Sequence, residues 1–148
     1  MKLIFLGTPD FAVPSLHAAR EAGQQVALVV TRPDARKGRG RRTSAPPVKQ
    51  AAAEMGLDVF QPRGVNEPDA VARLRGVGAD LGVVVAYGEL LSAEVLGTTR
   101  CGFLNVHASL LPRYRGAAPI NWALIRGESE TGVTVQRMAE RLDTGPIL

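Results

Sequence analysis

Short apolar runs separated by helix signals constrain the fold of this chain most strongly. Runs of strand length occur at Lys2–Leu6, Val26–Thr31, Asp58–Phe60, Leu81–Ala86 and Gly102–His107. Prolines that favour helix starts and glycines that favour helix stops lie between them, at Pro14, Gly23, Pro46-Pro47, Gly56, Pro68 and Gly127. Strands alternating with helices predict an α/β protein with right-handed parallel crossovers. The nearly continuous apolar run at 81–86 is typical of a strand covered on both faces.

The last stretch of the chain alternates in a different way. Across Thr131–Met138, Val133 and Val135 fall on one face of a predicted strand, and Thr134 and Gln136 on the other. A turn follows at Leu142–Gly145, and Pro146–Leu148 is similar to the beginning of another strand. We therefore expect an incomplete domain, cut at the carboxyl end.

Basic residues dominate the segment after the second run. Between Arg32 and Lys49 the only acid is Asp34, and the bases are Arg32, Arg36, Lys37, Arg39, Arg41, Arg42 and Lys49. Gly38 and Gly40 interleave with them, and no strand or helix period is visible. We expect a long, mobile surface loop, which could equally be a phosphate-binding element or a solvated run of charge.

A polar pair at the end of the fifth run is the candidate active site. Asn105 and His107 lie two residues apart, so a strand would project both from the same face. Open α/β sheets usually place their sites at the carboxyl ends of strands. Each residue also has a structural reading, as a strand cap or a hydrogen-bonded histidine, and Asp143 could be an ordinary turn residue. If the three converge, two donors and a carboxylate suit attack on an acyl carbon, with direct transfer to an external amine.

Several other classes are disfavoured. Gly7-Thr8-Pro9-Asp10-Phe11 lacks the GxGxxG spacing of a dinucleotide site, and Asp143-Thr144-Gly145 occurs once, whereas aspartic proteases need two carboxylates. The single cysteine excludes an intramolecular disulfide and favours a reducing compartment. No apolar run reaches the ~18 residues of a membrane span.

The segment Asn105–Gly116, with Leu142–Gly145 downstream, closely resembles the signature of the 10-formyltetrahydrofolate-dependent formyltransferases. The resemblance is strongest to members of that family that act on initiator methionyl-tRNA. Further matching motifs are Gly7–Phe11, Gly38–Arg42, Pro47–Lys49, Val84–Gly88 and Gly116–Ile120. The match spans essentially the whole chain, and its motifs follow the family's order.

The resemblance implies a Rossmann-like open, mostly parallel twisted sheet with helices on both faces. It also implies formyl transfer from 10-formyltetrahydrofolate to the amino group of initiator methionyl-tRNA through a tetrahedral intermediate. Residues 1–148 would be an incomplete amino-terminal catalytic domain, without the family's carboxyl-terminal barrel domain. We expect a cytoplasmic monomer without a metal or membrane attachment.

Residue roles carry over by position. The resemblance implies catalytic roles for Asn105, His107 and Asp143. It places the folate co-substrate against Val84, Ala86, Tyr87, Gly88, Ser109, Leu110, Leu111 and Pro112. It places tRNA against Arg36, Lys37, Arg39, Arg41 and Arg42, with Arg39 the key arginine. Two alternatives stay open: a sister enzyme that formylates a small amine (glycinamide ribonucleotide or an amino-sugar nucleotide), and an inactive folate- or RNA-binding module.

Overall fold

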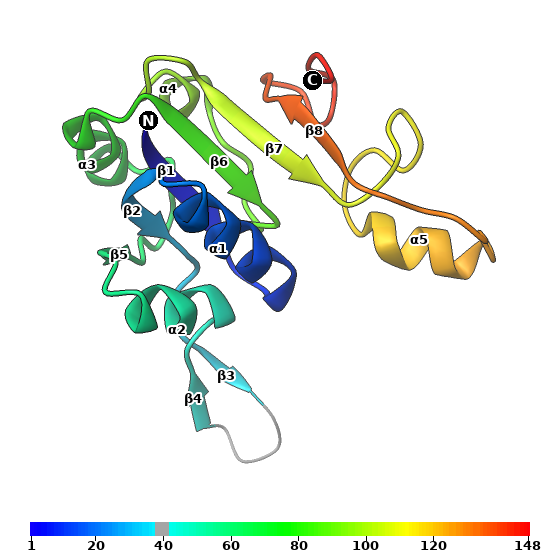
Figure 1. Cartoon of the computed structure of the whole chain (residues 1–148), viewed down its shortest axis with the longest axis horizontal. Coiled ribbons are helices and arrows are strands. Elements are labelled where there is room, and N and C mark those ends of the chain that lie inside the picture. The colour runs from blue at the N-terminus through cyan, green and yellow to red at the C-terminus, as the bar shows by residue number, and fades with distance from the viewer. Residues whose placement is uncertain (38–41) are drawn as a thin grey trace.

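The computed structural model describes residues 1–37 and 42–148, and its main body is a six-stranded sheet (Figure 1). The strand order is β5-β2-β1-β6-β7-β8; every neighbouring pair is parallel except β7 with β8, which is antiparallel. The strands are β1 (Lys2–Gly7), β2 (Gln25–Val30), β5 (Val59–Phe60), β6 (Leu81–Val85), β7 (Phe103–His107) and β8 (Thr134–Arg137). The expected open, mostly parallel sheet is confirmed, and its order is that of a doubly wound dinucleotide-binding fold.

Helices cover both faces of the sheet, as expected. A short 3-10 helix (Asp10–Ala12) precedes α1 (Val13–Glu21), followed by α2 (Pro47–Glu54), α3 (Pro68–Val77), α4 (Ala93–Leu96) and α5 (Pro119–Ile125). Successive residues of β1 point to opposite faces of the sheet and pack in two separate cores. Ile4 and Leu6 pack with residues of α3 and α4, and Phe5 packs with residues of α1 and α2. Among the described residues, no helix has the length and apolar character needed to cross a membrane.

Local sequence sets the helix boundaries. Pro68 occupies the first turn of α3, where its missing N–H costs nothing, and Gly78 ends the helix in the left-handed conformation at φ 60°. Ser92 caps α4 by accepting a hydrogen bond from the Val95 N–H at 3.3 Å. These residues explain why the helices fall where the sequence predicts them.

The basic segment after β2 is a hairpin, so the prediction of an irregular loop is wrong for part of it. β3 (Ala35–Lys37) and β4 (Arg42–Ser44) pair antiparallel, in the register Ala35↔Ser44 and Lys37↔Arg42. The hairpin extends away from the main sheet (Figure 1). Hydrophobic alternation marks a strand only when one face is buried against a core. That signal is missing from a polar, two-stranded ribbon held by its backbone hydrogen bonds.

The edge strand β8 buries its polar face. Thr134 and Gln136 are buried, whereas Val133 and Val135 are 52% and 38% exposed. The alternation predicted for this strand is confirmed, with hydrogen-bonding side chains on the covered side. This covered polar face lies beside the carboxyl end of β7, where Asn105 pairs with Gln136 and His107 with Thr134.

Candidate active site

The sheet brings Asn105, His107 and Asp143 together. β7 carries Asn105 and His107 on one face, and the loop after β8 carries Asp143. The Asn105 amide donates from Nδ2 to Asp143 Oδ1 at 3.2 Å, and His107 Nδ1 lies 3.5 Å from the same oxygen. The side chains of His107 and Asp143 are 7% and 6% exposed, so these contacts are shielded from water. The spatial convergence that the sequence left open is therefore present.

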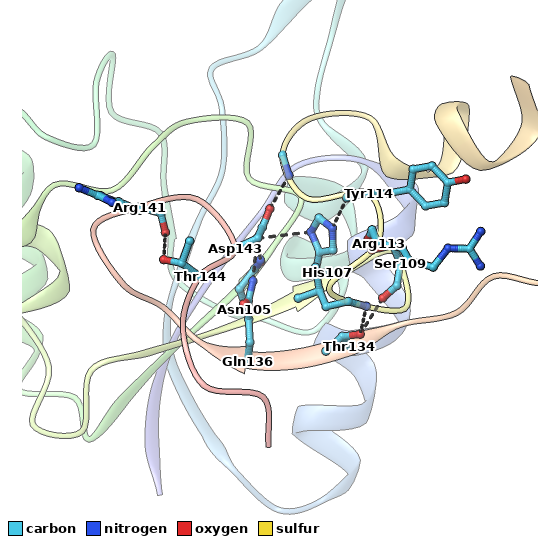
Figure 2. A network of polar contacts seen from close by, with 12 residues as sticks. Asn105, His107, Ser109, Arg113, Tyr114, Thr134, Gln136, Arg141, Asp143 and Thr144 are labelled. Atoms are coloured by element: carbon cyan, nitrogen blue, oxygen red, sulfur yellow. Dashed lines mark hydrogen bonds and ion pairs between the residues drawn. The ribbon is translucent and has the colours of Figure 1, made fainter. Parts of the chain in front are cut away.

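Donors surround the Asp143 carboxylate, as Figure 2 shows for its side-chain partners. Oδ1 also accepts from Gln136 Nε2 at 2.6 Å, and Oδ2 accepts from the backbone N–H of Gly116 at 2.8 Å. Asp143 itself has a positive φ of 49°, an uncommon conformation for a residue with a side chain. A strained backbone of this kind persists only where its surroundings hold it, and three hydrogen-bond donors together with the neighbouring His107 ring supply that hold.

His107 lies between two acceptors. Its Nδ1 faces Asp143, and its Nε2 lies 2.9 Å from the backbone carbonyl oxygen of Tyr114. Both contacts can be hydrogen bonds at once only when the imidazole carries a proton on each nitrogen. The ring is thus fixed at both ends and oriented within the site.

The resemblance places the folate near Val135–Asp143, a range that includes Gln136, but it gives Gln136 no role at the Asp143 carboxylate. Gln136 is 2% exposed and donates to Asp143, but its Oε1 has no hydrogen-bond partner in the described part of the chain. The only indication of this role in the sequence is that Gln136 lies on the polar face of the alternating run at 131–138. That face becomes informative only once β8 is paired with β7, which sequence alone does not specify.

A cavity of about 680 Å³ opens beside these residues. Its walls come from the loops after β1, β6, β7 and β8 and from the start of α5. Among the predicted folate contacts, Val84, Ala86, Tyr87 and Gly88 line it, together with Asn105, His107, Gln136 and Asp143. Its size is within the ~300–1,000 Å³ typical of small-molecule sites, and it lies at the carboxyl ends of parallel strands.

The other four predicted folate contacts, Ser109, Leu110, Leu111 and Pro112, are not among the residues that line this cavity, and their contact with folate stays a prediction. Ser109 is fully buried, and its hydroxyl donates to the carbonyl of Arg113 at 2.6 Å. Thr134 Oγ1 donates to the Ser109 carbonyl at 2.7 Å and accepts from the Leu111 N–H at 3.0 Å. These hydrogen bonds anchor Ser109 and Leu111 of the loop after β7 to Thr134 of β8.

Tyr87 is a neutral, buried part of the cavity wall. Burial raises the pKa of its phenol to about 12, and the nearby Glu89 carboxylate acts in the same direction. The side chain is 1% exposed and belongs to one of the two cores. We therefore assign Tyr87 a shape-forming role, without proton transfer near neutral pH.

The hairpin is attached firmly to the body of the protein. Arg32 Nη1 donates to Glu89 Oε1 at 2.5 Å, which connects the end of β2 to the loop after β6. Asp34 accepts from Lys49 Nζ at 2.8 Å and from Gln61 Nε2 at 2.7 Å. The hydrogen bond from Gln61 and the charge of Lys49 hold the pKa of the exposed Asp34 carboxyl below its usual value.

The residues predicted to contact tRNA divide into two groups. Arg36 and Lys37 lie on β3 and Arg42 on β4, so they belong to the hairpin that leaves the sheet. Arg39 and Arg41 lie outside the residues that the structure describes.

Comparison with known proteins gives one consistent result. A family model described as formyl transferase matches residues 1–148. The chain is 51% identical over 148 residues to a methionyl-tRNA formyltransferase of Solibacter usitatus and 53% identical to one of Geobacter metallireducens. Both matches take in the whole of this chain and 48% of the relative, so the chain spans about half the length of these curated relatives.

Solved structures agree with this assignment. The fold is similar to that of glycinamide ribonucleotide transformylase 1 from Geobacillus kaustophilus, with a TM-score of 0.78 and 26% identity. The similarity covers 99% of this chain and 79% of that one. With a family model matched along its full length and a shared architecture, this chain belongs to the formyl transferase family.

Proposed function

We propose that this chain carries the formyl-transferring site of an enzyme that formylates the amino group of initiator methionyl-tRNA. The observation that supports this most directly is the convergence of Asn105, His107 and Asp143 beside the cavity. Identity of 51–53% to curated methionyl-tRNA formyltransferases supports the choice of acceptor.

The cavity fits a folate-sized molecule. Its volume of about 680 Å³ suits a ligand of that size, and its walls combine apolar side chains with a few convergent polar groups. In this proposal 10-formyltetrahydrofolate supplies the formyl group, and Val84, Ala86, Tyr87 and Gly88 contribute to the wall that holds it.

The polar residues have separate roles in the transfer. The acceptor nitrogen bonds to the formyl carbon, the bond from that carbon to the donor nitrogen breaks, and the proton that the amine loses passes to the departing nitrogen. Asn105 and His107 supply hydrogen-bond donors for the oxygen that becomes negative during this exchange, with His107 Nε2 exchanging the Tyr114 carbonyl for that oxygen. Asp143 orients the His107 ring and assists the proton transfer.

The test is formylation of charged initiator tRNA by the protein as expressed from its gene. Replacing either His107 or Asn105 with alanine should lower turnover about 10²–10³-fold if each donates to the oxyanion. His17→Ala is the matched control, because the chain's other histidine is exposed on α1. Turnover near the wild-type level in both active-site variants would remove the proposed roles.

Substitutions in the hairpin test whether the formyl acceptor is a tRNA or a small amine. A polyanionic acceptor held by n phosphate contacts loses affinity with salt at a logarithmic slope of about −0.7 to −0.9 per contact. Replacing Arg36 and Arg42 together with glutamine should therefore reduce that slope by nearly 2 if both residues contact phosphate. A small-amine formyltransferase would show no change in its acceptor KM or in its salt dependence.

A further inference from the structure

A second hollow, separate from the cavity, gathers basic and aromatic side chains. It has a volume of about 380 Å³ and is lined by Arg113, Tyr114, Arg115, Trp122 and Arg126. None of these five residues lines the larger cavity beside Asp143. The hollow therefore combines three guanidinium groups with two aromatic rings.

The charges in this hollow are mostly unneutralised. Glu128 accepts from both Arg113 and the Tyr114 hydroxyl, and these contacts hold the pKa of its carboxyl below the usual value. Arg126 also lies near Tyr114, with its Cζ 5.4 Å from the centre of the Tyr114 ring. Arg115 forms no ion pair within the described residues. One carboxylate therefore faces three permanent cations, which favours an anionic ligand.

Tyr114 connects the hollow to the active site. Its φ of 56° is in the left-handed region, which is uncommon for a residue with a bulky side chain. This conformation lets its carbonyl face His107 Nε2 at 2.9 Å while its ring lies beside Arg113 and Arg126. Figure 2 shows the Tyr114 ring and the Arg113 side chain pointing away from Asp143. A ligand in the hollow would thus lie against the same short loop that holds His107 and, through Gly116, Asp143.

Trp122 adds an accessible stacking surface. It projects from α5 and is 49% exposed, although tryptophan usually buries most of its large ring. Unpaired nucleobases stack on exposed aromatic rings and on arginine planes, while arginines bind the phosphates between them. An acidic peptide would use the arginines but would leave the tryptophan face without a partner.

The geometry points to a binding site in this hollow for a phosphate-bearing, single-stranded segment of RNA. Arg115 and Arg126 bind phosphate, and Trp122 stacks on a base. The site holds the end of the acceptor next to the loop that supports the catalytic residues, and it acts in addition to the basic hairpin. The identity of the RNA as a charged tRNA rests on the proposed function.

The test measures binding of the 5′-phosphorylated RNA trinucleotide CCA, labelled for fluorescence anisotropy. Trp122→Ala should weaken binding about 5–100-fold, the range measured for loss of one stacked base, whereas Trp122→Phe should retain most of the affinity. Arg115→Met should weaken binding and reduce the logarithmic salt slope by about 0.7. Removing the 5′ phosphate from the RNA should reduce the difference in affinity between the wild type and Arg115→Met, because Arg115 then has one phosphate fewer to bind.

A matched control tests whether the effect belongs to the hollow. Arg20→Met removes one exposed arginine from α1, away from α5, and should leave the affinity unchanged. Because Trp122 is the only tryptophan in the 148 residues, quenching of its fluorescence by unlabelled RNA reports contact directly. Wild-type affinity in Trp122→Ala and Arg115→Met, or an equal loss in Arg20→Met, would overturn the inference.

The same experiment separates this inference from the proposed function. RNA binding that depends on Trp122 and Arg115, without formylation of charged tRNA, would support the RNA site and refute the proposed activity. If both substitutions leave formylation and RNA binding unchanged, the RNA site is refuted and the proposed activity is retained.

Discussion

Replacing Gln136 with methionine should change the stability of the protein very little, despite the short hydrogen bond that is lost. Gln136 Nε2 donates to the Asp143 carboxylate at 2.6 Å, and a hydrogen bond to a charged group contributes about 1.5–3 kcal/mol. The same side chain buries Oε1 without a partner, which costs about 1–3 kcal/mol. Methionine keeps a similar length and removes both polar atoms. The two terms therefore nearly cancel, and we expect a net change within about 1 kcal/mol.

Gln136→Glu is the informative contrast. It places a second carboxylate against that of Asp143, at a site that is 2% exposed in the native protein. Two carboxylates so close cannot both ionise, so the folded state takes up a proton that the unfolded state lacks near neutral pH. Stability must then fall as pH rises, because the folded state binds more protons. The slope approaches about 1.4 kcal/mol per pH unit for one proton.

Urea denaturation at pH 5, 6 and 7, followed by circular dichroism, measures both effects. The wild type and Gln136→Met should have similar midpoints at each pH, while Gln136→Glu should gain stability relative to the wild type as pH is lowered. A loss of more than about 2 kcal/mol in Gln136→Met would show that Oε1 is satisfied in the native protein. A pH-independent stability difference for Gln136→Glu would refute the close contact with Asp143.

Three further substitutions test the body of the domain. Gly82→Ala should cost about 3 kcal/mol or more in urea denaturation, because the added Cβ would lie 2.0 Å from Phe103 Cδ1 in the core. Gly76→Ala, on α3 with nothing within 4 Å of its Cβ position, should instead stabilise by about 0.5–1 kcal/mol. The Lys2 backbone N–H holds the pKa of the Asp80 carboxyl below its usual value, so Asp80 stabilises the fold above its unfolded pKa of about 3.9. Asp80→Asn should accordingly lower Tm at pH 7, with a difference from the wild type that shrinks as pH falls below about 4.

The main sheet and most of its helices could be predicted from sequence, because their signals are local. Apolar runs such as Leu81–Ala86 indicate buried strands, and Pro68 and Gly78 delimit a helix through their own backbone preferences. The two-residue spacing of Asn105 and His107 likewise fixes a shared face for any strand that contains them.

The missed features depend on pairing between distant segments. Gln136 is opposite Asn105 only in the particular register of β7 with β8, and no local pattern encodes that register. The sequence of the hairpin after β2 is mostly basic and polar, so it lacks an apolar alternation.

The order of the strands divides the molecule into two halves that can vary separately. β2 and its hairpin lie on one side of β1, whereas the described polar partners of Asp143 come from the chain after β6, on the other side. A hairpin inserted or deleted after β2 would leave the register of β7 with β8 unchanged. Changes on the hairpin side of β1 can therefore alter what the protein contacts there while the pairing that brings Asn105, His107 and Asp143 together is kept.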